Sequence, residues 1–186
     1  MFRSCFATLI SLLFSAAVSA VTIDFEGLAD GTVVGLQFPD VSFSTTSLGH
    51  DITVIDGFAP EGLRSICSLQ VVCDGDLVLD FAAPAINLSF LTNSDNATDP
   101  ISVDVFVSGS FDSTVLIPLD GIPETSDLID LSAFPNVTRI VVNQTDSAGL
   151  LYDRFEFTVV PEPASALLLG GGLVGIAIRR RRDPLA

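Results

Sequence analysis

The stretches ISVDVFV at residues 101–107 and VTRIVVN at residues 137–143 carry the pattern that decides the fold. In the first stretch every second residue is β-branched and apolar, so one face of an extended strand would be apolar and the other mixed. No segment between residues 21 and 160 has a convincing helical period. Similar short runs separated by turn residues recur at 21–26, 41–45, 51–55, 76–81, 86–91, 113–119, 127–131 and 152–159. The sequence therefore predicts an all-β fold, an antiparallel β-sandwich of the jelly-roll type.

The aromatic residues are mostly phenylalanine: the 186 residues include 14 Phe, one Tyr and no Trp. In the last predicted strand Phe155 and Phe157 share a face with Val159, opposite Arg154 and Glu156. This alternation assigns most of the phenylalanines to the core rather than to a sugar-stacking surface. Phe106 falls on the polar face of its strand and is the candidate exception.

The charge of the chain is strongly negative, with 23 acidic against 8 basic residues and no lysine. Between residues 21 and 160, three arginines stand against 21 acidic residues. Such a field repels phosphate backbones, so binding to nucleic acid is excluded.

The N-terminal segment MFRSCFATLISLLFSAAVSA, residues 1–20, has the three parts of a secretory signal peptide. Arg3 provides the positive charge, an apolar stretch follows, and Val18-Ser19-Ala20 is a cleavage site for signal peptidase after Ala20. A permanent membrane anchor is the alternative, but the apolar stretch is short for a span of about 20 residues. We therefore expect an exported protein.

Export changes the interpretation of the two cysteines that would remain in the mature chain. Cys67 and Cys73 lie six positions apart in CSLQVVC, and an oxidising compartment permits a disulfide between them. Two free buried thiols are the alternative. Zinc is disfavoured because its tetrahedral sites need three or four soft or imidazole ligands.

The C-terminal segment also has three parts. The residues Val160, Pro161, Glu162 and Pro163 precede an apolar stretch, 164–178, which ends at the basic cluster Arg179, Arg180, Arg181 and Arg182. As a helix the apolar stretch would extend about 22 Å, which is short of a hydrocarbon core of about 30 Å. It is suited to a temporary transmembrane anchor whose arginines stay cytoplasmic. A buried core helix is the alternative.

This arrangement resembles the PEP-CTERM sorting signal of Gram-negative, exopolysaccharide-producing bacteria, whose Pro-Glu-Pro motif is matched by residues 161–163. The resemblance implies that the tail holds the exported protein transiently in the inner membrane. An exosortase would then recognise the motif, cleave near it and release the protein to the cell surface or the medium. The predicted organisation is a signal peptide (1–20), a β-sandwich domain (21–158) and a PEP-CTERM sorting tail (159–186).

The middle domain is similar, more weakly, to jelly-roll carbohydrate-binding modules. That resemblance implies a structural calcium ion where the first and last strands meet. Asp24, Glu26 and Asp153 are the candidate ligands, since calcium takes carboxylate and carbonyl oxygens. Solvated surface carboxylates are the alternative, because the domain is rich in acidic residues.

Evidence for an enzyme is weak. His50 is the one histidine, and no G-x-S-x-G elbow or phosphate-binding loop accompanies it. We expect a non-catalytic cell-surface or extracellular-matrix protein, whose negative charge favours divalent-cation bridging to acidic extracellular polysaccharide. The alternatives are a carbohydrate-binding module for an extracellular polysaccharide and, less favoured, a secreted hydrolase with paired carboxylates.

Overall fold

The computed structural model describes residues 19–57, 59–69, 72–94, 100–120, 122, 125–144 and 149–160. Most of the predicted signal peptide, the motif residues Pro161 to Pro163, the apolar stretch 164–178 and the arginines 179–182 lie outside the described residues. Residues Ser19–Val160 form one unit by themselves. Within the described part of the chain, no helix is long and apolar enough to span a bilayer.

The described residues form strands and turns. The strands are β1 (Ser19–Ile23), β2 (Val41–Ser44), β3 (Asp51–Asp56), β4 (Arg64–Leu69), β5 (Leu77–Ser94), β6 (Ile101–Val107), β7 (Ser110–Ile117), β8 (Asp127–Asp130), β9 (Val137–Asn143) and β10 (Leu150–Val159). The strand pairs are antiparallel throughout, which confirms the predicted all-β class.

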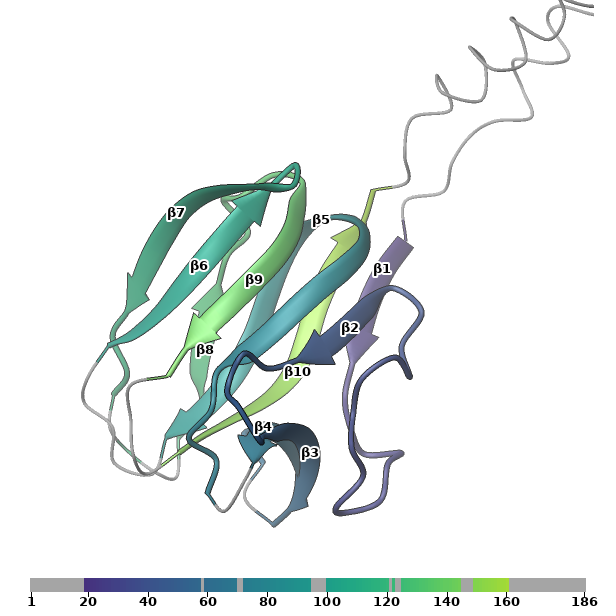
Figure 1. Cartoon of the computed structure of the whole chain (residues 1–186), viewed down its shortest axis with the longest axis vertical. Coiled ribbons are helices and arrows are strands. Elements are labelled where there is room, and N and C mark those ends of the chain that lie inside the picture. Colours follow the sequence, from purple (N-terminus) through teal and green to yellow (C-terminus); the bar gives the residue numbers. More distant parts are fainter. Residues whose placement is uncertain are drawn as a thin grey trace, which may run out of the picture. The chain divides into compact units, whose positions relative to one another are not determined.

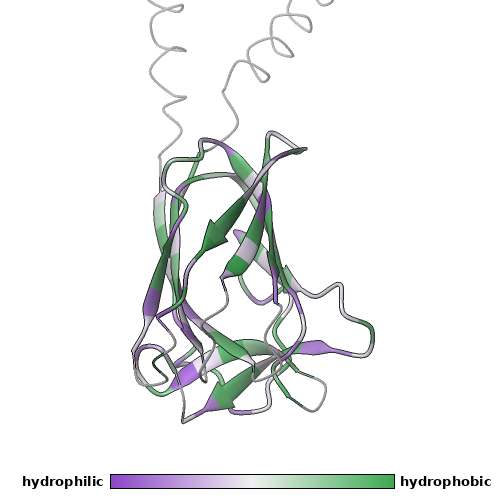
Figure 2. Ribbon diagram, turned by 90° about the vertical axis from the view of Figure 1, so that its left-hand side faces the viewer, coloured by the Kyte–Doolittle hydropathy of each residue, from purple (hydrophilic) through white to green (hydrophobic). Residues whose placement is uncertain are grey.

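The alternation seen in the sequence sets which side chains are buried. In β6, Ile101, Val103 and Val105 are buried, whereas Ser102 and Asp104 are half-exposed. Figure 2 shows the same alternation of hydrophobic and hydrophilic residues along several strands. The turn from β6 to β7 has positive φ at both Ser108 and Gly109, as a tight type I′ hairpin requires.

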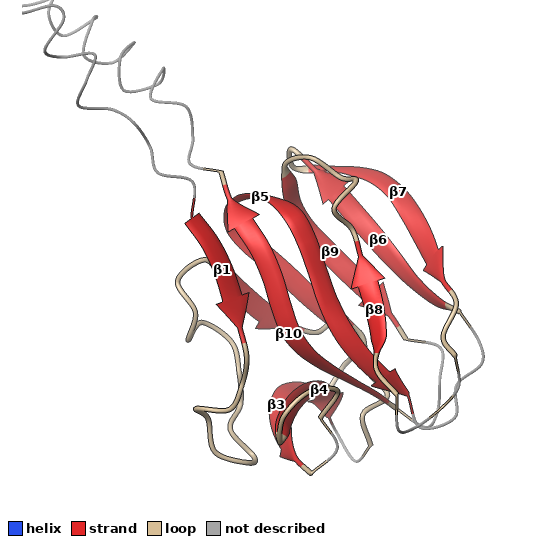
Figure 3. Ribbon diagram, turned by 180° about the vertical axis from the view of Figure 1, so that it is seen from behind, coloured by secondary structure: helices blue, strands red, loops and turns tan. Residues whose placement is uncertain are grey.

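The strands form two layers that share β5 (Figures 1 and 3). The first part of β5 pairs with β2 and β9, and β9 continues the layer through β6 to β7. The second part pairs with β10 and β8, and β10 in turn pairs with β1 and β4. Figure 1 shows β5 bending between its two parts, and the register of β5 with β9 shifts between Asp80 and Ala85, so one strand passes from layer to layer.

The core between the layers is built around aromatic rings. Phe25 makes edge-on contacts with Phe38, Phe43 and Phe155, and Phe90 stacks on Phe155 with ring centroids 5.1 Å apart. Aromatic pairs in these geometries add about 1 kcal/mol each beyond the burial of their area. The assignment of most phenylalanines to the core is therefore confirmed.

The strand predictions were wrong in several details. The first strand, predicted over 21–26, spans Ser19–Ile23. The runs 76–81 and 86–91 belong to one strand, because the backbone stays extended through the bend that joins the layers. Strand β4 was not predicted, since RSICSL has two serines in place of an apolar alternation. Both serines, Ser65 and Ser68, are nevertheless fully buried, because β4 packs between β3 and β10.

Candidate functional site

A pocket lies where the loop after β1, the loop between β3 and β4, and strand β10 meet. Its volume is about 260 Å³, and its lining residues are Thr22, Asp24, Glu26, Glu61, Gly62, Asp153 and Arg154. We call it the junction pocket. The three residues predicted from the sequence as calcium ligands, Asp24, Glu26 and Asp153, all line it. Glu61 and Arg154 were not predicted, because no pattern in the sequence relates residue 61 to residue 154.

A β-bulge in β10 shapes this pocket. Asp153 pairs with Leu91 and Glu156 pairs with Ser89, so Arg154 and Phe155 together face Phe90. Arg154 has a φ of 45°, a left-handed conformation that costs a non-glycine residue about 1 kcal/mol or more. The bulge interrupts the alternation, so Tyr152 and Asp153 are both buried although they are neighbours.

Hydrogen bonds and ion pairs compensate for the strained backbone. The Arg154 N–H donates to Asp153 Oδ1 at 2.7 Å. The Arg154 guanidinium donates to Glu61 Oε2 at 2.6 Å and to Glu156 Oε1 at 2.8 Å. Arg154 therefore joins the β3–β4 loop to β10 across the pocket and supplies its positive charge.

The pKa values of Asp153 and Glu26, two carboxyl groups of the pocket, shift in opposite directions. Burial raises the pKa of Asp153 to about 6, and the nearby charges of Glu26 and Asp24 add to this shift. The pKa of Glu26 is instead lowered, because the backbone N–H groups of Leu63 and Arg64 donate to its Oε1 at 2.6 and 3.0 Å. Gly62 has a φ of 74°, and a Cβ there would also displace this Glu26 carboxylate, so the loop favours glycine at this position.

The fit of the pocket to a metal ion is incomplete. Across the described residues, no group of three or more His, Cys, Asp or Glu side chains is placed to hold an ion. Glu26 Oε1 and Asp153 Oδ1 already accept backbone hydrogen bonds. The calcium site at Asp24, Glu26 and Asp153 thus stays a prediction, although the fold brings the three residues to one pocket.

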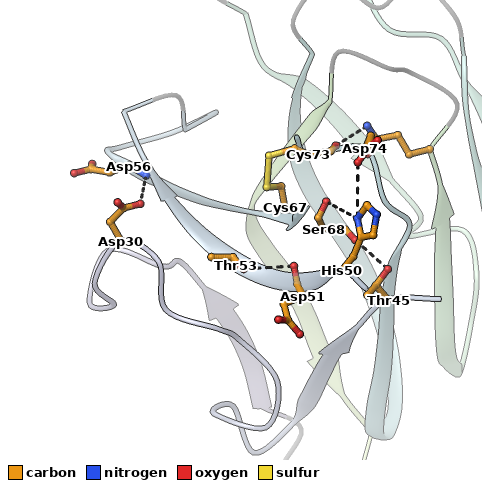
Figure 4. The surroundings of a disulfide bond; sticks show 11 residues. Asp30, Thr45, His50, Asp51, Thr53, Asp56, Cys67, Ser68, Cys73 and Asp74 are labelled. Carbon is orange, nitrogen blue, oxygen red and sulfur yellow. Dashed lines mark hydrogen bonds and ion pairs between the residues drawn. A yellow bond between two sulfur atoms is a disulfide. The ribbon is translucent and has the colours of Figure 1, made fainter. Parts of the chain in front are cut away.

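The disulfide between Cys67 and Cys73 is present, with Cα atoms 5.3 Å apart, as the sequence predicted. Figure 4 shows His50 near this disulfide, with its ring directed toward Ser68 and Asp74. The His50 Nδ1 lies 3.4 Å from the carbonyl oxygen of Ser68 and 3.8 Å from Asp74 Oδ1. A Cβ at Gly75 would collide with Ser68 Oγ and with the His50 ring. The His50 ring is therefore packed closely against the residues Ser68, Asp74 and Gly75.

A second candidate surface lies on the outer side of the layer β2–β5–β9–β6–β7. Phe106, which the sequence singled out, pairs across strands with Phe111 on one side and Arg139 on the other. Arg139 pairs in turn with Asp80, and Asp80 with Ser42. We call these five residues the outer row.

The outer row combines aromatic and charged groups. The Phe106 and Phe111 rings are 5.7 Å apart, and the Arg139 guanidinium carbon lies 5.8 Å from the Phe106 ring centroid. Phe111 is 57% exposed. The Arg139 Nε is 3.7 Å from Asp80 Oδ1, beyond hydrogen-bonding distance. The row offers apolar ring area beside donors and acceptors, the chemistry that a sugar ring needs.

The end of β10 leads directly to the predicted sorting motif. Val159 pairs with Ser19 of β1 and with Ala85 of β5, and the Val160 N–H donates to the carbonyl oxygen of Pro84 at 2.8 Å. The folded domain thus extends to the residue before Pro161.

The described residues thus form an all-β domain, and its last strand, β10, ends where the predicted sorting tail begins. Residues 159–182 match the model of the PEP-CTERM protein-sorting motif, so the resemblance seen in the sequence is confirmed for this segment. The matched range includes the motif residues 160–163 and the four arginines. The motif implies an extracellular protein that an exosortase processes after transient membrane anchoring.

A search of curated proteins found no match to the chain. Among solved structures, the K2 cleaved adhesin domain of Lys-gingipain is similar, with 13% identity over 76% of this chain and 99% of that chain and a TM-score of 0.47. A cyclase from Fischerella sp. TAU has 13% identity over 77% and 98%, with a TM-score of 0.43. A variant of the family 29 carbohydrate-binding module CBM29-2 has 13% identity over 76% and 93%, with a TM-score of 0.42.

Proposed function

We propose that the protein is an exported, non-catalytic component of the cell surface or extracellular matrix of a Gram-negative bacterium. The observation that carries this proposal is the sorting motif at residues 159–182, which begins at the last residue of β10. Signal peptidase, the inner membrane and an exosortase would be its successive partners during export.

The charge of the domain supports a role in a hydrated extracellular layer. Between residues 21 and 160 the acidic residues outnumber the arginines 21 to three. High negative charge keeps such a protein soluble and monomeric. Divalent cations would bridge its carboxylates to those of an acidic polysaccharide, since calcium accepts oxygen ligands from several molecules.

Replacing the motif tests this proposal. In the variant Pro161→Ala, Glu162→Ala, Pro163→Ala, we expect the protein to stay in the membrane fraction with residues 179–182 attached. The unaltered chain should reach the surface or the medium without them, as mass spectrometry of its C-terminal peptide would show. Leu128→Ala, an exposed position on β8, is the matched control and should be processed normally. Surface protein that still ends in the arginine cluster would contradict the proposal.

Binding to a polysaccharide is a second candidate function, and the outer row is the observation that favours it. Phe106, Phe111 and Arg139 offer ring surface and a guanidinium on one face of the sheet. Stacking on such rings orients a sugar, and the neighbouring polar groups supply specificity.

A glycan array tests this second candidate. We expect saturable binding by the unaltered protein and a loss of about tenfold or more in Phe106→Ala and Phe111→Ala, with Leu128→Ala unchanged. Binding that survives both substitutions would place any glycan site elsewhere, and the absence of binding to every glycan would count against the function.

A further inference from the structure

The predicted signal-peptidase site and the first residue of the sorting motif lie at the same end of one strand pair. Signal peptidase is expected to cut between Ala20 and Val21, and Ala20 belongs to β1. The sorting motif begins at Val159, which is the last residue of β10. Because β1 and β10 are antiparallel, the start of β1 lies beside the end of β10 (Figure 1).

The register shows what signal-peptide removal does to this pair. Ser19 pairs with Val159 and Ala20 pairs with Thr158, whereas residues 21–23 pair with Phe157, Glu156 and Phe155. Cleavage after Ala20 therefore leaves three of the five residue pairs in place. The two lost pairs are those that cover the edge of β10 next to the sorting motif.

The other edge of β10 stays paired after that cleavage. Thr158 pairs with Ile86 and Val159 with Ala85 of β5, and the Val160 N–H donates to the carbonyl oxygen of Pro84. The backbone is therefore held by the domain up to the residue before Pro161. A sorting enzyme that binds its substrate as an extended strand can reach Thr158 and Val159 only from the β1 side.

We propose that residues Ser19 and Ala20 shield the end of β10, so that removal of the signal peptide makes this end accessible for the sorting cleavage. Once Val21 is the N-terminus, the part of β10 that had faced Ser19 and Ala20 is an open strand edge of the kind that binds an extended segment of a partner by β-augmentation. The occupant is the substrate-binding strand of the sorting enzyme. This inference rests on the proposed function.

Both steps are acyl transfers and need no added oxidant or metal. Signal peptidase hydrolyses the Ala20–Val21 peptide bond, so that water leaves a carboxylate on Ala20 and an amine on Val21. The sorting enzyme breaks a peptide bond near the motif, passes the acyl group to water or to an acceptor amine, and leaves a free amine on the released tail. The order of the two steps follows from the pairing of the strands.

The test compares two full chains whose leaders are replaced by one that signal peptidase removes at a chosen bond. One mature chain begins at Val21 and the other at Ser19, so both lose their N-terminal membrane segment and differ by two residues. We expect the tail of the chain that begins at Val21 to be cleaved about fivefold faster in a pulse-chase experiment, the factor expected for one or two backbone hydrogen bonds.

Two variants of the longer chain separate pairing from length. Ser19→Pro with Ala20→Pro keeps the length but removes two strand donors, and its tail should be cleaved as fast as that of the chain beginning at Val21. A flexible linker of about six Gly and Ser residues between Val160 and Pro161 should also remove the difference in rate. Formation of the Cys67–Cys73 disulfide reports export and folding in every chain.

Each outcome decides the inference. Equal rates for the chains that begin at Ser19 and Val21 would overturn the shielding, while the proposed function would stand. A slow double-proline variant would likewise overturn it, since length alone would explain the delay. If no chain is cut near the motif, the proposed function fails, and the inference fails with it.

Discussion

The buried carboxyl group of Asp153 gives the domain a specific dependence of stability on pH. Asp153 is 2% exposed, and its pKa rises from 3.8 to about 6 in the folded state. The groups that face it are Asp24 and Glu26 after β1, Glu61 in the β3–β4 loop and Arg154 in β10. We consider the substitution Asp153→Asn, which retains an oxygen to accept the Arg154 N–H.

The direction of the effect follows from proton linkage. An acid with a higher pKa in the folded state binds more protons there, so folding is favoured at low pH. This contribution is lost as the pH rises from about 4 through 6, the folded pKa of Asp153. A shift of about two units corresponds to a free energy of about 3 kcal/mol.

Urea unfolding of the processed protein at pH values from 4 to 8 measures this contribution. Relative to Asp153→Asn, the unaltered protein should lose up to about 3 kcal/mol of unfolding free energy between pH 4 and pH 7. Asp24→Asn removes one neighbouring charge and should shift the midpoint of this loss to lower pH. Asp112→Asn, an exposed position on β7, should leave the profile unchanged. Parallel profiles for the unaltered protein and Asp153→Asn would refute the reasoning.

Three further predictions concern stability. Tyr152→Phe should stabilise the domain or change its free energy of unfolding by no more than about 1 kcal/mol, because the buried Tyr152 hydroxyl has no hydrogen-bond partner in the described part of the chain. A decrease in this free energy of more than about 2 kcal/mol, measured by thermal unfolding, would reveal an unrecognised partner. Cys67→Ser with Cys73→Ser should cost about 2 kcal/mol, as expected for so short a loop, and a reducing agent should lower the melting temperature of the unaltered protein but not of the variant. The calcium hypothesis predicts that the ion raises the melting temperature and that a chelator reverses the rise; no change would count against an ion in the junction pocket.

Much of the candidate site was accessible from the sequence. Asp24 and Glu26 were singled out because they lie on the non-core face of the first predicted strand, and Asp153 because it begins the last predicted one, where the resemblance to carbohydrate-binding modules implied a calcium ion. All three line the junction pocket. Glu61 was missed, since its place opposite Arg154 depends on how the β3–β4 loop folds over β10. The bulge at Arg154 was also missed, because glycine is the usual signal for a left-handed residue and is absent there.

The outer row was partly predictable. Phe106 was recognised because it interrupts a polar face, but its neighbours Phe111, Arg139 and Asp80 come from three other strands. Cross-strand pairs depend on the register, and a slip of one residue would turn each side chain to the opposite face. The sequence therefore named one member, and the pairing supplied the others.

The sequence by itself determined what local chemistry encodes. The alternation of apolar and polar residues determined the all-β class, the spacing of Cys67 and Cys73 determined the disulfide, and residues 159–182 determined the sorting signal. Each of these is a property of residues that are close together in the sequence. Tertiary structure alone decided that β5 serves both layers, that Arg154 meets Glu61, and that Ser19 lies beside Val159. Those contacts join residues far apart in the chain, and they form because burying both apolar faces in one core leaves few registers for the strands.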